Sequence, residues 1–231
     1  MTATNQMLLG VVAATSIEGQ IFTKAIPRQE RYILCISGVG ADNARHAANE
    51  LIRKGASRLL SFGFAGALDP ECNAGTIVIP NTVITQGNKS FNLTSEWRDA
   101  ITSRSRDSIN FKTGVLLETR TIAMNPKEKQ QLLNSYSADY VDMESGALAA
   151  VALQAEIPYL VLRAISDEAS DTLPGFVNHF AQPGYDWKNI PIHVLKHPSN
   201  LRYLPKLVHN FRLARNNLTR VIRLTGSIFC P

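Results

Sequence analysis

Cysteine is scarce in this chain of 231 residues, and the few cysteines form no motif. Cys35, Cys72 and Cys230 are odd in number and far apart, so they make neither a C-x-x-C pair nor a disulfide framework. Cys35 lies inside the apolar stretch YILCIS, where we expect a small core residue. This cysteine usage fits a protein of the reducing cytoplasm.

Long apolar runs are absent as well. No stretch approaches the run of about 18 apolar residues that a bilayer span requires, and MTATNQMLLG at the N-terminus lacks the basic segment of a signal peptide. Neither a G-x-S-x-G motif nor a Walker A motif occurs. The sequence is therefore not expected to be a serine hydrolase or a P-loop NTPase. A composition of 45% apolar and 19% charged residues is that of a globular protein able to bury a core.

Acidic residues are almost missing from the C-terminal part of the chain. Residues 181–231 contain eight Lys or Arg and one acid, Asp186, whereas the rest of the chain is close to neutral. We therefore predict a folded domain over 1–180 and a basic extension over 181–231. Such a charge asymmetry indicates a partner or a surface for the extension.

Apolar strands alternate with helices along the first part of the chain. Strands are predicted at 7–14, 31–37, 57–66, 75–84, 113–119, 138–143 and 158–166, and helices at about 41–54, 125–133 and 144–156. The region 87–110 is polar and is expected to form a loop, and the pattern fades after Asp171. The alternation predicts an α/β fold with three layers, α/β/α, around a mixed central sheet.

Polar residues gather where four of the predicted strands end. The segments are ATSIE (14–18), GFAGALDP (63–70), VDMES (141–145) and ISDEASD (165–171). In open α/β folds the ligand usually binds beyond the C-terminal ends of the strands. Asp167, which ends an apolar strand, is therefore either the N-cap of a following helix or a general acid or base.

Two further patterns have simpler explanations. SGVG (37–40) resembles a phosphate-binding turn, but Asn43 stands where a dinucleotide fingerprint has its third glycine, so a tight strand-to-helix turn is favoured. His193 and His197 have the i, i+4 spacing of metal ligands, but prolines flank them and no third ligand lies nearby. We predict no metal site and no resident cofactor.

Four motifs together resemble the nucleoside phosphorylase/nucleosidase superfamily, and within it the 5′-methylthioadenosine/S-adenosylhomocysteine nucleosidases. They are GVVAATSIE, SGVG followed by GFAGALDP, VDMESGALA, and RAISDEASD, and they span roughly residues 8–171. The resemblance implies a nucleoside phosphorylase-like fold for 1–180, a small nucleoside as substrate, and a homo-oligomer.

The resemblance also implies roles for the matching residues in breaking a ribosidic bond. Asp167 matches the acid that protonates the leaving purine, which requires a carboxyl group that holds a proton near neutral pH. Glu144 matches the ribose-binding carboxylate, with Met143 beside the sugar, and Glu18 matches the carboxylate that activates the attacking water.

Further matches outline the rest of the implied site. Base-binding positions are Ile122, Ala123 and Ser166, and the nucleophile or phosphate pocket comprises Gly38, Gly40, Gly63, Phe64, Ala65 and Gly66. Phosphate in place of water as co-substrate would need cationic ligands. Arg45 and Arg120 are the candidates, although an exposed ion pair is the simpler role for either.

Three positions depart from the nucleosidase pattern. Phe64 stands where the nucleosidases usually have serine, Asp142 where they usually have glutamate, and Ile122 where an aromatic side chain commonly stacks on adenine. We therefore expect altered nucleophile and base pockets, and a structural role for Asp142.

The end of the chain predicts a basic amphipathic helix. Its apolar positions follow helical spacing, and five basic residues are interleaved: Lys206, Arg212, Arg215, Arg220 and Arg223. The helix either packs on the core with a solvated basic face or lies on a membrane surface. A nucleic-acid contact is disfavoured because no nucleic-acid-binding motif accompanies it.

The turn SFGFAGALDP, VDMESGA and the segment LPKLVHNFRLARNNL are similar to the hopanoid-associated phosphorylases. That likeness implies release of adenine from adenosylhopane, a nucleoside linked to a lipid, by a cytoplasmic enzyme at the inner face of the membrane. The alternatives are a 5′-methylthioadenosine/S-adenosylhomocysteine nucleosidase acting in solution and a non-catalytic nucleoside-binding module at a membrane.

Overall fold

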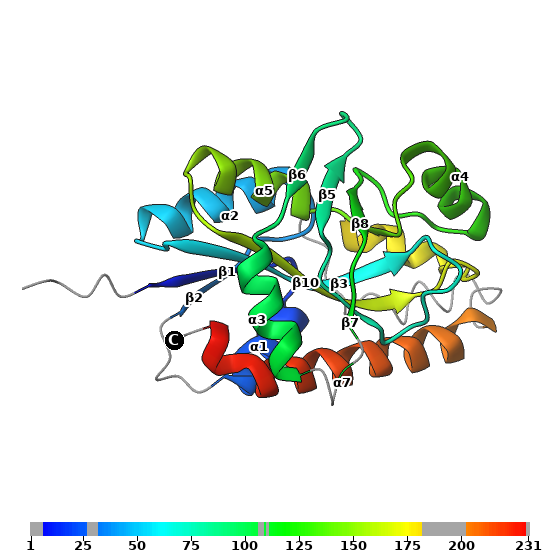
Figure 1. Ribbon diagram of the computed structural model, residues 1–231. Coiled ribbons are helices and arrows are strands. Elements are labelled where there is room, and N and C mark those ends of the chain that lie inside the picture. Colours follow the sequence, from blue (N-terminus) through cyan, green and yellow to red (C-terminus); the bar gives the residue numbers. More distant parts are fainter. Residues whose placement is uncertain (1–6, 27–31, 106–108, 110, 182–201, 230–231) are drawn as a thin grey trace, which may run out of the picture.

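A computed structural model describes residues 7–26, 32–105, 109, 111–181 and 202–229 (Figure 1). The histidine pair His193 and His197, together with Cys230 and most of the predicted extension before the final helix, lies outside the described residues. The described chain forms a mixed sheet with helices on both faces, which confirms the predicted α/β/α fold.

The sheet is built around two long neighbouring strands. The strands are β1 (Leu9–Ala13), β2 (Tyr32–Ile36), β3 (Arg58–Ala67), β4 (Ile77–Val78), β5 (Thr82–Thr85), β6 (Ser90–Asn92), β7 (Phe111–Lys112), β8 (Val115–Glu118), β9 (Tyr140–Asp142) and β10 (Tyr159–Asp167). Their order is β6-β5-β8-β9-β3-β10-β4-β7, and β1 joins β2 to the first half of β3. Pairs β5–β6, β3–β9 and β10–β4 are antiparallel and the others are parallel.

Helices cover the sheet in two layers. On one face lie α2 (Ala41–Arg53) and α5 (Ser145–Gln154), with α4 (Pro126–Tyr136) toward one end, and on the other lie α1 (Ser16–Ala25), α3 (Ser95–Ser105) and α7 (Leu204–Phe229) (Figure 1). A short 3-10 helix, η1 (Gly175–Ala181), precedes the undescribed segment. Separate apolar cores fill the two layers, because the strands are buried on both faces.

Two expectations about local structure were wrong. The region 87–110 contains β6 and α3 instead of a loop, and α3 is anchored in the core by Trp97 and Ile101. The stretch 75–84 forms two short strands, β4 and β5, in place of one. α1 was not predicted at all, although Thr15 and Glu18 form the reciprocal capping box that marks a helix start.

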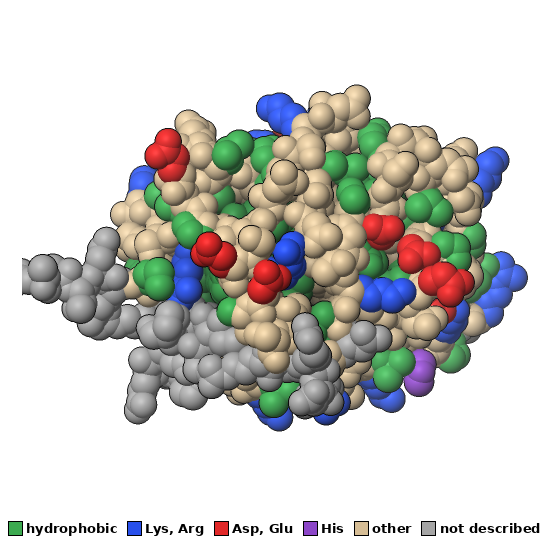
Figure 2. Space-filling model, viewed as in Figure 1, with side chains coloured by type: hydrophobic (Ala, Val, Ile, Leu, Met, Phe, Trp, Pro, Cys, Tyr) green, Lys and Arg blue, Asp and Glu red, His purple; other side chains and the backbone are tan. Residues whose placement is uncertain are grey.

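The C-terminal helix α7 packs on the body of the protein. Ala214, Leu218, Val221 and Ile222 are completely buried among side chains of α1, α3 and the sheet. Its outer face carries exposed basic residues, which lie along the lower edge of the molecule in the space-filling view (Figure 2). No helix in the described part of the chain is long and apolar enough to cross a membrane.

Candidate active site

The candidate site lies along the second halves of β3 and β10, which are neighbours in the sheet. The two strands are parallel and place Gly63 directly opposite Arg163. A Cβ atom on Gly63 would lie 2.1 Å from Glu18 Oε1 and 2.9 Å from Arg163 Nη1, closer than atoms can approach. Glycine at this position therefore lets a carboxylate and a guanidinium group both approach the strand closely.

Glu18 reaches this point from the first turn of α1. Its Oε2 accepts hydrogen bonds from the backbone N and the hydroxyl of Thr15, at 2.7 and 2.8 Å, and its Oε1 accepts one from Phe64 N at 3.0 Å. Burial raises the pKa of Glu18, an effect that Arg163 and these hydrogen bonds oppose. A fixed carboxyl group with a raised pKa suits a general base.

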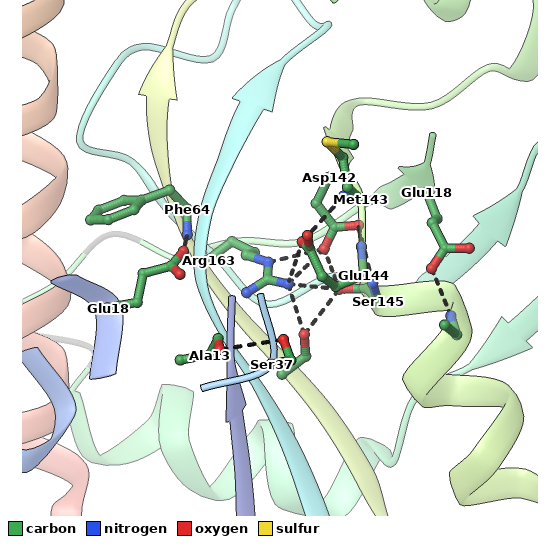
Figure 3. Close-up of polar contacts among 12 residues, drawn as sticks. Ala13, Glu18, Ser37, Phe64, Glu118, Asp142, Met143, Glu144, Ser145 and Arg163 are labelled. Carbon is green, nitrogen blue, oxygen red and sulfur yellow. Dashed lines mark hydrogen bonds and ion pairs between the residues drawn. The ribbon is translucent and has the colours of Figure 1, made fainter. Parts of the chain in front are cut away.

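Arg163 is the buried cation at the centre of the cluster, and the sequence reasoning overlooked it although the RAISD motif contains it (Figure 3). Its Nε and Nη2 donate to Asp142 Oδ2 at 3.0 and 2.7 Å, and Nη2 also donates to the hydroxyls of Ser61 and Ser145. Burial lowers the pKa of Arg163, but the surrounding carboxylates raise it more, so the group stays charged.

Asp142 is the principal partner of this arginine. Besides the bonds from Arg163, its carboxylate accepts hydrogen bonds from the backbone N of Glu144 and from both the backbone N and the hydroxyl of Ser145. The side chain is therefore fully used inside the protein. This arrangement agrees with a structural role for Asp142, which fixes the start of α5.

Glu144 occupies the N-cap position of α5 but makes no cap hydrogen bond. Its side chain turns instead to Gly40, whose backbone N donates to Oε1 at 2.8 Å, and its Oε2 lies 3.9 Å from Arg163 Nη2. Gly40 has φ of 102°, a conformation that favours glycine. Burial, together with the nearby Asp142 carboxylate, raises the pKa of Glu144 to about 8 against the opposing effect of Arg163. Met143 precedes it and is half-buried.

Asp167 ends β10 and lies over Gly66, where an added Cβ would be 2.9 Å from Oδ2. Lys129, which is 1% exposed, reaches it from α4: Lys129 Nζ lies 2.5 Å from Asp167 Oδ2 and donates to the backbone O of Glu168. The hydroxyl of Ser166 donates to Asp167 Oδ1 at 2.9 Å. The predicted acid is thus half of a buried ion pair, a contact that no local sequence pattern indicates.

The predicted base-binding segment lies beside the loop that follows Asp167. Met124 O accepts a hydrogen bond from Leu173 N at 2.8 Å, so residues 122–124 and 168–173 are joined. Ala123 is buried and Ile122 half-buried within that segment. Ser166, which directly precedes Asp167 on β10, donates to Ala65 O of β3 at 3.3 Å.

Phe64 does not turn its ring into the cluster. The ring packs on Phe211 of α7, with centroids 4.9 Å apart, and points away from Arg163 (Figure 3). Only the backbone N–H of Phe64 serves the cluster, through Glu18. Gly38 shapes the turn before α2 with φ of 81°.

Of the two candidate phosphate ligands, Arg45 lies on the exposed face of α2 in an ion pair with Asp42, at 2.6 Å, as the simpler explanation predicted. Arg120 is exposed, and its backbone N donates to Gln86. Among the described residues no three His, Cys, Asp or Glu side chains are placed to hold a metal ion.

Glu118 is a half-buried acid near the cluster that the sequence reasoning did not single out. It ends β8 and accepts a hydrogen bond from Ala147 N at 2.7 Å, so it caps α5 in place of Glu144 (Figure 3). Burial is the main cause that raises the pKa of Glu118 to about 7, and Asp142 adds to it.

A model of the phosphorylase superfamily matches residues 15–186, so the chain belongs to this superfamily of enzymes. Aminodeoxyfutalosine nucleosidase of Campylobacter jejuni is 25% identical over 162 residues, which cover 62% of this chain and 71% of that protein. A 5′-methylthioadenosine/S-adenosylhomocysteine nucleosidase of Staphylococcus aureus is 24% identical over 168 residues, covering 64% and 74%.

Solved structures share the fold over almost the whole chain. Futalosine hydrolase of Helicobacter pylori superimposes with a TM-score of 0.72 at 13% identity, covering 97% of this chain and 99% of that one. The 5′-methylthioadenosine/S-adenosylhomocysteine nucleosidase of Colwellia psychrerythraea, solved with adenine, gives 0.73 at 17% identity, covering 97% and 96%. At these identities the likeness concerns the fold alone.

Proposed function

We propose that the protein hydrolyses the N-glycosidic bond of an adenosyl nucleoside and releases adenine. The observation that carries the proposal is the arrangement of three buried acids, Glu18, Glu144 and Asp167, around the end of β3 and β10. Two curated relatives are nucleosidases, which supports the same reaction. A module that only binds nucleosides would have no need of a proton donor.

Each acid has one task in the proposed reaction. Asp167, which has to exchange its ion pair with Lys129 for a proton beforehand, gives this proton to the purine as the bond from N9 to the ribose C1′ breaks and the electron pair leaves with the base. Glu144 accepts hydrogen bonds from the ribose hydroxyls, which strengthen as the sugar becomes cationic. Glu18 takes a proton from the water that attacks C1′, so adenine and a free sugar are the products.

Water is a better nucleophile than phosphate for this site. The Phe64 N–H, which could otherwise donate to a phosphate oxygen, donates to Glu18. The carboxylate of Glu18 would repel a phosphate dianion, and the nearby cation, Arg163, is already bound to Asp142. A carboxylate raises the electrostatic energy of a nearby anion. Attack by phosphate would therefore need the Glu18 side chain to move away.

Adenine release should therefore be independent of phosphate. Purified protein incubated with adenosine-type nucleosides is expected to form free adenine and the free sugar at the same rate with and without inorganic phosphate. Chromatography of the products distinguishes the free sugar from the sugar 1-phosphate. Formation of the 1-phosphate, or a rate that rises in proportion to phosphate, would assign the enzyme to the phosphorylases.

We further propose that the natural nucleoside carries a lipid at its 5′ carbon, with adenosylhopane as the substrate. α7 supports this with an outer face of exposed basic residues, Arg212, Arg215, Arg220 and Arg223, beside the exposed apolar side chains of Val208, Leu213 and Leu224. A basic face with apolar residues suits an anionic bilayer, where such a substrate resides. 5′-Methylthioadenosine is the competing substrate, because curated relatives act on it.

The outer face of α7 should bind anionic vesicles in a salt-sensitive way. Changing Arg212, Arg215, Arg220 and Arg223 to glutamine is expected to abolish sedimentation with vesicles containing phosphatidylglycerol, because each basic residue near the surface contributes about 1 kcal/mol. These residues are exposed, so the core of α7 is kept, which a truncation would destroy.

A control variant carries the same charge change on other surfaces. It replaces the exposed residues Lys24, Arg53, Lys89 and Lys127 by glutamine. We expect it to sediment like the wild type, and high salt to release both. Equal binding by the α7 variant and the wild type would refute the membrane proposal and leave the hydrolase proposal intact.

A further inference from the structure

The first turns of α7 touch the candidate active site and not only the core. Lys206 and Asn210 contact the turn that follows Asp167, and Phe211 contacts Phe64, whose backbone N binds Glu18. α7 begins at Leu204, beyond residues 15–186 that the superfamily model matches. The contacts of α7 thus come from outside the stretch that the superfamily model matches.

On the side of the acid, α7 holds the turn that directly follows Asp167. Lys206 Nζ lies 2.5 Å from Asp171 Oδ1 and 2.9 Å from Glu168 Oε2. The amide of Asn210, which is 3% exposed, donates to Asp171 Oδ2 at 2.9 Å. Asp171 also accepts a hydrogen bond from Glu168 N at 2.8 Å. The turn is therefore held by this internal hydrogen bond and by the contacts from α7.

On the side of the nucleophile, α7 holds the residue that binds Glu18. The ring of Phe211 packs on the ring of Phe64, and the backbone N of Phe64 donates to Glu18 Oε1 at 3.0 Å. Asn217, farther along the helix, donates to Gly75 O at 2.8 Å, and Gly75 N donates to Ile165 O in β10. One rigid helix therefore contacts the supports of both catalytic groups.

We propose that Lys206, Asn210 and Phe211 are positioning residues that hold the acid and the water-activating carboxylate in a fixed relation to each other. This inference rests on the proposed hydrolase function. Its physical basis is the steep dependence of rate on geometry, since a misplacement of about 1 Å can cost about 100-fold.

The Lys206 contacts are not needed to hold α7 in place. The apolar anchors of the helix are Ala214, Leu218, Val221 and Ile222, farther along the chain. The Lys206 side chain is 52% exposed, and its buried partner Asp171 keeps the hydrogen bonds from Asn210 and from Glu168 N when Lys206 is replaced. A loss of the Lys206 contacts should therefore appear in the reaction rate and not in stability.

The first test compares two substitutions of Lys206. Lys206→Met is expected to lower kcat for adenine release by about 10-fold with KM changed by less than about 3-fold, whereas Lys206→Arg keeps the charge and most of the rate. The matched control is Lys54→Met, because Lys54 is 54% exposed and also paired with a glutamate, Glu50, away from the site. All three variants should unfold at the wild-type temperature.

The second test separates the acid from the nucleophile by changing the leaving group. The electron-poor base of 2-chloroadenosine needs less help from an acid than adenine does, so Lys206→Met should lose less rate on it. Phe211→Leu, which removes the ring contact but keeps an apolar side chain, should lose equally on both substrates, because water attack is common to both.

Three results would overturn the positioning role. They are an unchanged kcat in Lys206→Met, an equal loss in Lys54→Met, and the same loss on both bases in Lys206→Met. A wild-type protein that releases neither base would contradict the proposed hydrolase function itself, and this result is seen before any variant is compared.

Discussion

Replacing Glu144 by glutamine is expected to lower kcat/KM for adenine release by about 10²–10⁴-fold. Two charge-assisted hydrogen bonds to ribose hydroxyls contribute about 1.5–3 kcal/mol each, and they strengthen in the cationic transition state. Glutamine keeps the shape and an oxygen that can accept from Gly40 N, so the geometry at 2.8 Å is retained. The measurement is steady-state kinetics on an adenosyl nucleoside.

Glu144→Gln should not destabilise the fold. Burial and Asp142 raise the pKa of Glu144 from its ordinary 4.5 to about 8, so the folded protein favours the uncharged carboxyl group. Ionising it costs stability increasingly between pH 4.5 and about 8, a cost that glutamine never incurs. At pH 9 the variant should therefore unfold at the wild-type temperature or above it, since Arg163 keeps Asp142 as its partner.

The pH dependence gives an internal check on the same residue. In the free enzyme, kcat/KM should rise with pH through about 8 as Glu144 ionises and becomes able to accept both ribose hydroxyls. Glu144→Gln should lack this rise. A variant with full activity, or one that keeps the wild-type pH profile, would remove Glu144 from the mechanism.

The layers of the fold were predictable because buried strands appear in the sequence as apolar runs. β1 and β2 fall inside predicted strands, and β3 and β10 each end one residue beyond theirs; the register of β3 and β10 brings the predicted strand ends together. The missed helix α3 is mainly polar and depends on two anchors, Trp97 and Ile101, so its periodicity is weak. α1 was missed for a different reason: its capping box, Thr15 and Glu18, was read only as chemistry.

The candidate site was predictable as a set of strand-end acids but not as a network. Glu144 and Asp167 were recognised by their motifs, yet their charge partners come from elsewhere in the chain. Lys129 lies 38 residues before Asp167 on a helix that looks ordinary in sequence. Such pairings are set by tertiary packing, which a local pattern does not record.

Tertiary packing also decides which surface the C-terminal helix contacts. Its amphipathic pattern predicted the helix correctly. The pattern did not distinguish whether the apolar side packs on the protein or on a membrane. Packing against α1 and α3 occupies Ala214 and Leu218. What remains for a membrane is the outer face, so the two alternatives apply to different faces of α7.

Replacing Arg163 by methionine is expected to lower the free energy of unfolding by about 3–5 kcal/mol, the usual cost of removing one partner from a buried ion pair. Asp142 would remain buried without its cation, because Arg163 and Asp142 side chains are 3% and 1% exposed. For a protein of this size the midpoint of thermal unfolding should fall by about 6–20 °C. Calorimetry or circular dichroism measures it.

A double variant, Arg163→Met with Asp142→Asn, distinguishes two causes of the lost stability. One is the loss of the ion pair, and the other is the Asp142 charge that stays buried without a partner. It removes the charge that the single variant leaves buried, so we expect it to be more stable than Arg163→Met and less stable than the wild type. Arg45→Met, which breaks an exposed pair with Asp42, is the control and should change stability by less than about 1 kcal/mol. If Arg163→Met matched that control, Arg163 would not be the cation on which the buried carboxylates depend.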